Sequence, residues 1–240
     1  MIYGALLAGG SGKRMKTLSV PKQFAEIGGI PIIIYSLRKM LEVEKFSKII
    51  VAMNIDWIGY ASDLFNKYLT SCELDQVVII PGGKERLDSF SNVAKYIRAN
   101  YPINQEDIVI CHEAVRPFVL TEMIEKCIKY TLSDKIAATF LPVNDTIFSK
   151  DEKGFVIASE DRCYQVQGQT PSGFNIELLL DVLSGLTVEE SKKNTGTTQL
   201  FLNRGYKIPV VTGNTENFKI TTDIDLAIAE VMINKEKNNE

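Results

Sequence analysis

The part of this sequence that could do chemistry most directly is a glycine-rich stretch near its start. Residues 6–15 read LLAGGSGKRM, and the tripeptide PKQ follows at residues 21–23. Basic residues recur here, whereas the first acidic residue is Glu26. Glycines let backbone N–H groups approach a phosphate closely, and flanking cations supply the countercharge that a triphosphate needs. The stretch therefore predicts a cradle for the phosphates of a nucleotide. Its members are Ala8, Gly9, Gly10, Gly12, Arg14 and Lys22.

Two better-known phosphate-binding motifs do not fit this stretch. The P-loop requires serine or threonine after its glycine-lysine pair, and Arg14 stands there instead. The dinucleotide motif GxGxxG, if it began at Gly10, would need a third glycine where Met15 stands. The simplest structural alternative is a strand-to-helix turn with scattered basic residues. The combination of AGGxGxRM with PKQ favours the nucleotide site over that alternative.

Further polar segments follow predicted strands or lie late in the chain. Residues 82–89 read GGKERLDS and open a helix, where backbone N–H groups can face an anion or a base. Residues 111–117 read CHEAVRP, and His112 is the only histidine of the chain. A metal cluster and a hydrolase triad are therefore disfavoured, and His112 is expected to be structural while Glu113 and Arg116 face a cleft. The remaining segments are QGQTP at residues 167–171 and NFKIT at residues 217–221.

These segments need a scaffold, and the order of apolar runs predicts one. Short β-branched runs alternate with stretches that carry apolar residues at helical spacing. The alternation predicts an α/β fold with a doubly wound, mostly parallel, Rossmann-like sheet covered by helices on both faces. In such sheets ligands bind beyond the carboxyl ends of strands, where the glycine-rich stretch lies. The predicted strands are residues 2–8, 48–53, 76–80, 107–111 and 136–142, and the predicted helices are residues 31–43, 57–69, 86–99 and 121–132.

The alternation breaks after residue 142. Residues 145–148 and 155–157 flank a turn at residues 150–154 and indicate a hairpin that no helix covers. Because a two-stranded hairpin cannot bury its own apolar face, this β-arm at about residues 143–160 predicts a homodimer formed with the arm of a second subunit. The helical and strand patterns then resume, with helices expected at residues 175–184, near 197–203 and after Thr222, and a strand at residues 207–212.

Composition bounds the class of protein. The 240 residues suit a single domain over residues 1–240, and the net charge of −3 gives no field that would recruit nucleic acid. No apolar run reaches the roughly 18 residues of a membrane helix, and no signal peptide is evident. The four cysteines are widely spaced and lack a CxxC pair, which suits reduced thiols. We therefore expect a cytoplasmic protein with neither a nucleic-acid nor a membrane partner.

Taken in order, the motifs resemble those of one enzyme family. The series AGGxGxRM, PKQ, GGxxRxxS, HxxxRP, DT, QTP and NxKIT is similar to that of the polyol-phosphate cytidylyltransferases, which include methylerythritol phosphate and ribitol-5-phosphate enzymes. The resemblance spans residues 5–232. It implies a nucleotidyltransferase fold with a projecting β-arm that dimerises. It also implies transfer of CMP from CTP to a polyol phosphate, with release of pyrophosphate and with Mg²⁺ or another divalent cation as cofactor.

The resemblance assigns roles position by position. Arg14 and Lys22 fall on the triphosphate and, with Lys219, form the catalytic set. Glu113 stands where the family has an aspartate near the ribose and the metal. Being one methylene longer, it is expected to act indirectly, through a water or the ribose. The residues that fall at the cytosine pocket are Gly83 and Ser89. Those that fall around the polyol phosphate are Arg116, Thr146, Arg162, Thr170 and Lys219, with Thr146 and Arg162 near or on the arm and so able to serve the neighbouring subunit.

Local details favour the ribitol-type enzymes and hence D-ribitol 5-phosphate as substrate. They are the LAGG sequence and residues 54–57, 115–118 and 164–171, and they imply a place in teichoic acid or capsule biosynthesis. The first alternative is the methylerythritol phosphate enzyme of isoprenoid precursor synthesis, since the two polyols differ by few contacts. Glu113 and Gly196 replace aspartates of the family, which keeps a non-catalytic nucleotide-binding homologue as an alternative of another class. A Rossmann-type oxidoreductase is a further alternative.

Overall fold

Among the residues that the structure describes, seven strands form the central sheet. The computed structural model describes residues 1–10, 20–187, 190 and 196–239. The strand order is β11-β7-β10-β6-β1-β4-β5, and β10 runs antiparallel to both of its neighbours while the other pairs are parallel. The mostly parallel sheet predicted from the sequence is thus confirmed. The strands are β1 (Ile2–Leu7), β4 (Lys48–Met53), β5 (Val77–Pro81), β6 (Ile108–Glu113), β7 (Ile136–Pro142), β10 (Val166–Asn175) and β11 (Val210–Thr212).

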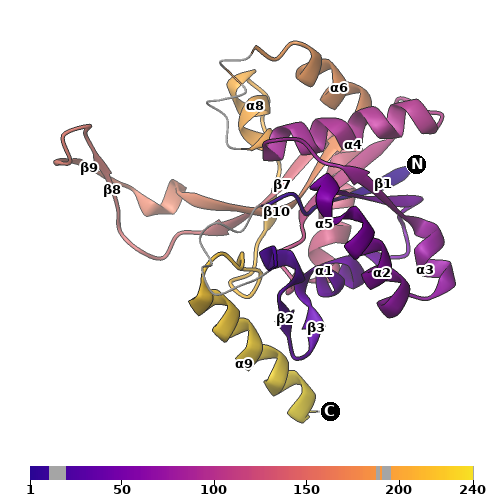
Figure 1. Ribbon diagram of the computed structural model, residues 1–240. Coiled ribbons are helices and arrows are strands. Elements are labelled where there is room, and N and C mark those ends of the chain that lie inside the picture. Colours follow the sequence, from indigo (N-terminus) through magenta and orange to yellow (C-terminus); the bar gives the residue numbers. More distant parts are fainter. Residues whose placement is uncertain (11–19, 188–189, 191–195, 240) are drawn as a thin grey trace.

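Helices cover both faces of the sheet because side chains alternate along each strand. In β1, Leu6 belongs to the core formed with α1, α2 and α5, whereas Tyr3 and Ala5 belong to the core formed with α4, α6 and α8. Figure 1 shows α4, α6 and α8 on one side of the strands and α1 and α2 on the other. The helices are α1 (Ile32–Leu41), α2 (Ile58–Tyr68), α3 (Ser71–Gln76), α4 (Arg86–Asn100), α5 (Thr121–Asp134), α6 (Ile176–Ser184), α8 (Thr197–Asn203) and α9 (Asp223–Asn239).

The last helix packs beside a small hairpin near the start of the chain. The strands β2 (Glu26–Ile27) and β3 (Ile30–Pro31) pair antiparallel, and Ile27 packs against Ala229 of α9 in a separate apolar cluster. A capping box begins α9, because the Asp225 N–H donates to Thr222 Oγ1 and the Thr222 N–H donates to the Asp225 carboxylate. In the part of the chain described here, no helix combines the length and the apolar character needed to cross a bilayer.

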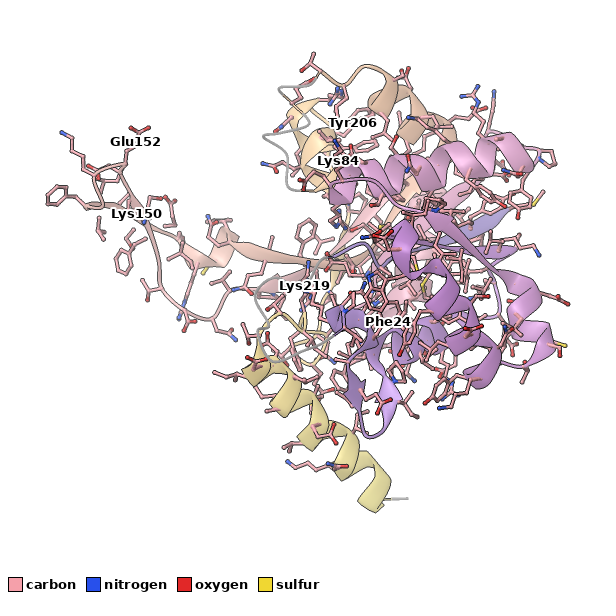
Figure 2. The ribbon with its side chains drawn as sticks, in the orientation of Figure 1. Phe24, Lys84, Lys150, Glu152, Tyr206 and Lys219 are labelled. Carbon is pink, nitrogen blue, oxygen red and sulfur yellow. The ribbon has the colours of Figure 1, made fainter. Side chains whose placement is uncertain are left out.

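The arm predicted after residue 142 is present. Its strands β8 (Ile147–Lys150) and β9 (Val156–Glu160) pair antiparallel around a turn in which Gly154 has φ of +91°. Figure 1 shows the arm extending away from the central sheet, and Figure 2 shows Lys150 and Glu152 at its far end. Its apolar side chains face outward: Phe155 is 67% exposed. The hairpin prediction is therefore confirmed, together with the uncovered apolar surface on which it depended.

Four strands and α-helices of the described residues were not predicted from the sequence. The longest of them is β10, whose residues QGQTPSG include neither a β-branched run nor a clear alternation. This strand is nevertheless buried from Thr170 to Asn175, because it lies between β6 and β7. The other three are the short helix α3 and the two-residue strands β2 and β3. The strand expected at residues 207–212 is shorter than predicted, since β11 begins at Val210.

Candidate active site

A cavity of about 350 Å³ opens where the chain leaves the carboxyl end of β1. We call it the first cavity. Its walls come from residues 7–10 and 22–23, from the loop after β5 and from three residues farther along the chain, Glu113, Val115 and Lys219. The Ala8 N–H donates to the Ala52 carbonyl at 2.8 Å, which ties the start of the glycine-rich stretch to β4. The first cavity therefore lies beyond the carboxyl ends of parallel strands, where the sequence predicts a ligand site.

The loop between β5 and α4 forms a closed turn on one wall of the first cavity. The Gly83 N–H donates to Ser89 Oγ at 3.0 Å, and Ser89 Oγ donates in turn to the Glu85 carbonyl at 3.1 Å. A Cβ atom at Gly83 would lie 2.1 Å from Asp88 Cβ, so only glycine fits there. Lys84 follows on the same wall, beside the start of α4 in Figure 2. The two residues predicted at a base pocket, Gly83 and Ser89, therefore lie together.

Lys22 belongs to a short 3-10 helix at residues 22–24 and lines the first cavity. Its Nζ donates to the carbonyl of Ile220 at 3.2 Å, and its side chain is largely buried. The neighbouring Gln23 donates from Nε2 to the Ala8 carbonyl at 2.7 Å. The PKQ segment is therefore bonded both to the glycine-rich stretch and to the segment that carries Lys219, although some 200 residues separate the latter two in sequence.

Glu113, the last residue of β6, contacts three cations from three parts of the chain. Its Oε1 accepts from Lys219 Nζ at 2.7 Å and lies 3.3 Å from Arg86 Nε. Its Oε2 accepts from Arg116 Nε at 2.9 Å. Glu113 is 8% exposed, so these pairs are largely shielded from water. We call the group Arg86, Glu113, Arg116 and Lys219 the charged junction.

The cations of the charged junction outweigh the cost of burying the carboxylate. Burial alone would raise the pKa of Glu113, but the charges of Lys219, Arg86 and Arg116 and the hydrogen bond from Lys219 hold it well below its usual range. Glu113 is thus an anion at neutral pH. One carboxylate among three cations leaves the junction with a net positive charge, which suits a site that receives phosphate.

A second cavity, of about 380 Å³, lies on the other side of the charged junction. Its walls come from β7 and β10 and from residues 196–202 around α8. Arg86, Glu113 and Lys219 line both cavities. Both volumes lie in the range of small-molecule sites. The arrangement can therefore hold two ligands whose charged ends meet at the junction.

A hydrogen-bonded network fixes the wall shared by β6, β10 and the segment before α9. Arg116 Nη1 donates to the Asn217 carbonyl at 2.7 Å, and Asn217 Nδ2 donates to the Thr170 carbonyl at 2.7 Å. His112 is fully buried and contacts both Thr170 and the Arg116 backbone. This network sets the positions of Thr170 and Arg116, and it places Lys219 two residues beyond Asn217. The expectation that His112 is structural agrees with this burial.

Two predicted substrate residues lie away from both cavities within this chain. Thr146 is exposed in the segment that leads to β8, and Arg162 is exposed in the 3-10 helix after β9, where its Nη1 donates to the Asn144 carbonyl at 2.9 Å. Neither residue lines the first or the second cavity. Their proposed role in the neighbouring subunit depends on an assembly of two chains.

The remaining predicted residues divide into those brought together and those outside the described residues. Ala8, Gly9, Gly10, Lys22, Gly83, Ser89, Glu113, Arg116, Thr170 and Lys219 line the two cavities. Gly12, Arg14 and Thr195 lie outside the residues that the structure describes. Gly196 lines the second cavity, and a Cβ atom there would lie 3.8 Å from Arg86 Nη1.

Sequence reasoning missed several residues of the site. Arg86 stands inside the recognised GGxxRxxS motif, yet only the glycine and serine of that motif received roles. Gln23 likewise stands inside PKQ. Gln169 stands inside QTP in the same way. The other polar residues of the second cavity, Thr139, Ser172, Thr198 and Gln199, belong to none of the recognised motifs.

The chain matches known proteins over nearly its whole length. Residues 2–235 match the family model described as 2-C-methyl-D-erythritol 4-phosphate cytidylyltransferase (IspD). The chain is 36% identical over 236 residues to the ribitol-5-phosphate cytidylyltransferase of Streptococcus pneumoniae serotype 2, which covers 98% of this chain and 100% of the relative. It is 34% identical to the enzyme of the same name from Lactiplantibacillus plantarum, covering 98% and 99%.

Solved structures of cytidylyltransferases superpose on nearly the whole chain. The 4-diphosphocytidyl-2C-methyl-D-erythritol synthase of Anaerococcus prevotii superposes with a TM-score of 0.79 at 25% identity, covering 97% of this chain and 96% of that one. The 2-C-methyl-D-erythritol 4-phosphate cytidylyltransferase of Francisella tularensis superposes with a TM-score of 0.76 at 25% identity, covering 96% and 98%. This chain therefore belongs to the IspD family of polyol-phosphate cytidylyltransferases.

Proposed function

We propose that this protein transfers CMP from CTP to D-ribitol 5-phosphate, giving CDP-ribitol and pyrophosphate. The observation that carries the proposal is the pair of cavities that meet at the charged junction. In this assignment CTP occupies the first cavity, where the closed turn at Gly83 and Ser89 faces the base. The polyol phosphate occupies the second cavity, with its phosphate at Arg116 and Lys219.

The reaction needs positioning and charge neutralisation more than covalent work by the protein. An oxygen of the polyol phosphate attacks the α-phosphorus of CTP, a new P–O bond forms, and the bond between the α-phosphorus and the bridging oxygen breaks. Pyrophosphate leaves with that electron pair. Lys22 and Arg14 would neutralise the triphosphate, and Lys219, which lines both cavities, would hold the attacking phosphate against the α-phosphorus.

Glu113 has a defined part in this scheme. Without ligands it holds three cations together that would otherwise repel one another. When phosphate enters, Lys219 and Arg86 can turn toward it while Arg116 keeps Glu113 in place, since the Arg116 pair is the more buried of the two arginine pairs. The junction is thus preorganised for an anion before the anion arrives.

A divalent cation fits the site as part of the nucleotide complex. Among the described residues, no group of three His, Cys, Asp or Glu side chains could hold a metal ion, and both oxygens of Glu113 already accept from cations. Mg²⁺ commonly binds through substrate phosphates and water with one or two carboxylates. The triphosphate oxygens would therefore hold the ion, with Glu113 acting at most through a water. The bound ion would supply charge neutralisation of the triphosphate.

The choice of polyol follows the relatives. The curated relatives at 34–36% identity are named for ribitol 5-phosphate, whereas the solved structures at 25% identity are named for methylerythritol. Thr139, Gln169, Thr198 and Gln199 lie on the walls of the second cavity and offer hydrogen-bonding groups to a chain of hydroxyls. Methylerythritol 4-phosphate is the second candidate, favoured by the family model.

We also propose a homodimer formed through the arm. Phe148, Phe155, Val156 and Ile157 are each more than half exposed, and a hairpin alone cannot bury them. Replacing Phe155 and Ile157 together by serine should give a monomer in analytical ultracentrifugation with reduced activity, because Thr146 and Arg162 would no longer reach a neighbouring site. A wild-type chain that sediments as a monomer at micromolar concentration would contradict this part of the proposal.

The activity itself is tested by pyrophosphate release. Wild-type protein is incubated with Mg²⁺, with CTP or UTP, and with ribitol 5-phosphate, methylerythritol 4-phosphate or no acceptor. We expect release with CTP and ribitol 5-phosphate together, and at least about tenfold lower kcat/KM with methylerythritol 4-phosphate, as a single discriminating hydroxyl contact would give. Preference for methylerythritol 4-phosphate would select the second candidate. Binding of CTP without release in any arm would indicate a non-catalytic homologue.

A further inference from the structure

His112 and Thr170 form a pair on the wall of the second cavity that the proposed reaction does not yet use. Thr170 Oγ1 lies 2.9 Å from His112 Nδ1, and His112 Nε2 lies 3.0 Å from the carbonyl oxygen of Arg116. The histidine is fully buried, and Thr170 is 4% exposed on the cavity wall. Both ring nitrogens therefore have one partner each, and one of these partners faces the substrate site.

The protons of this pair can be assigned from its partners. A backbone carbonyl can only accept, so Nε2 must carry a proton and donate it to the oxygen of Arg116. A neutral imidazole has one proton, which leaves Nδ1 as an acceptor. Thr170 has a single hydroxyl proton, and Nδ1 receives it. Burial lowers the pKa of His112 to about 4, and the nearby Arg116 charge also lowers it, which agrees with a neutral ring.

The hydroxyl of Thr170 then has only lone pairs to offer. One of them accepts from the Glu113 N–H at 3.4 Å. The other is available to a ligand in the second cavity. A lone pair attracts a hydroxyl group of the ligand, whereas a fully ionised phosphate oxygen, which also offers only lone pairs, would be repelled.

We infer that His112 is a positioning residue that makes Thr170 a hydrogen-bond acceptor for a hydroxyl group of the polyol. The inference rests on the proposed function and deepens it, because it orients the second substrate. The phosphate lies at Lys219 and Arg116, and the polyol chain runs from there along β10 past Thr170. Thr170 thereby distinguishes a polyol phosphate from a phosphate on an alkyl chain.

The tautomer can be observed directly because the chain has one histidine. We expect ¹⁵N-histidine NMR of the full chain at pH 7 to show a protonated Nε2 and an unprotonated Nδ1, both free and with ribitol 5-phosphate. A proton on Nδ1 in the ligand-bound protein would overturn the inference, because Thr170 could then donate to phosphate.

Binding measurements test the acceptor role. The probes are ribitol 5-phosphate and pentyl phosphate, which share the phosphate and chain length but differ in hydroxyl groups, each titrated by calorimetry. We expect Thr170→Val to raise the Kd for ribitol 5-phosphate by about tenfold or more, as expected for one lost hydrogen bond. The Kd for pentyl phosphate should stay within about twofold of the wild-type value. Thr170→Ser, which keeps the hydroxyl, should restore most of the ribitol 5-phosphate affinity.

The contrary outcomes are distinct. If Thr170→Val weakened the binding of both probes equally, Thr170 would be assigned to the phosphate and the inference would be overturned. This comparison requires that the melting temperature of Thr170→Val match that of Thr170→Ser. Unchanged ribitol 5-phosphate affinity in Thr170→Val would also overturn the inference while leaving the proposed function standing. A wild-type protein that binds no ribitol 5-phosphate would overturn both.

Discussion

The two cavities have comparable volumes but different walls. The first is lined by the glycines after β1, by the closed turn at Gly83 and by Lys22 and Gln23. The second is lined by side chains from β7, β10 and α8. Arg86, Glu113 and Lys219 of the charged junction line both cavities. In the proposed assignment these residues meet the phosphates of both substrates, whereas base and polyol contact separate surfaces that can be altered independently.

The largest expected effect comes from a substitution at Glu113, which lines both cavities. Glu113→Gln removes the carboxylate charge and leaves Arg86, Arg116 and Lys219 to repel one another. We expect kcat/KM to fall by about 10²-fold or more for both substrates, the loss typical of a preorganised electrostatic contact. The free energy of unfolding should fall by about 3 kcal/mol, as when one partner of a buried ion pair is removed.

Steady-state kinetics and urea unfolding would measure both effects. The matched control is Glu106→Gln, which removes an exposed carboxylate in the loop before β6 and leaves the junction unchanged. If Glu113→Gln impaired the use of CTP alone, the junction would belong to one cavity and the comparison would be wrong.

A substitution confined to the first cavity should raise the KM for CTP without changing the KM for the polyol phosphate. Gly83→Ala places a methyl group against Asp88 and must open the turn, at a cost of about 1–3 kcal/mol. The KM for CTP should rise by about tenfold, with little change in the KM for the polyol phosphate. Gly59→Ala, where a Cβ atom meets nothing within 4 Å, is the control and should behave as wild type.

A substitution confined to the second cavity should have a smaller effect, and on the KM for the polyol phosphate alone. Thr198→Val removes one hydroxyl from the wall formed by α8. The KM for ribitol 5-phosphate should rise by about fivefold because one hydrogen bond is lost, while the KM for CTP stays constant. Thr212→Val, an exposed position in β11, provides the matched control. A rise in the KM for CTP with Thr198→Val would contradict the separation of the two surfaces.

The smallest expected effect is a pH dependence of stability. The pKa of Glu113 is lowered in the folded state, so the folded protein binds this proton less readily than the unfolded chain. Its stabilisation is complete above the unfolded pKa of about 4.3 and is lost as pH falls through the lower folded pKa. The difference in melting temperature between wild type and Glu113→Gln should therefore shrink as pH falls from 7 to about 3. A constant difference would show that the charge of Glu113 does not stabilise the fold.

Sequence patterns predicted the first cavity better than the second for a physical reason. Its glycines and cations lie in short contiguous motifs, and strand alternation alone places those motifs at one edge of the sheet. The β-branched runs of β4, β5 and β6 likewise predicted much of the sheet. The hairpin from Ile147 to Glu160 was recognisable because its turn residues and apolar runs are local.

The second cavity depends on contacts between distant segments. Its main wall, β10, is a polar strand that is stable only between β6 and β7, so its sequence carries no strand signal of its own. Arg86 stood in a recognised motif, but its pairing with Glu113 across 27 residues required the fold. The same holds for the bond from Asn217 to Thr170, which joins positions 47 residues apart.

The most direct test of the account is a crystal structure of the protein with Mg²⁺, a non-hydrolysable CTP analogue and ribitol 5-phosphate. We expect the base to lie against the turn at Gly83 and Ser89 and the polyol to lie along β10. Lys219 should lie between the acceptor phosphate and the α-phosphorus. Lys219 would then have left Glu113 for phosphate, while Arg116 remained paired with it. Both ligands in one cavity, or Lys219 still bound to Glu113 with both ligands present, would contradict the account.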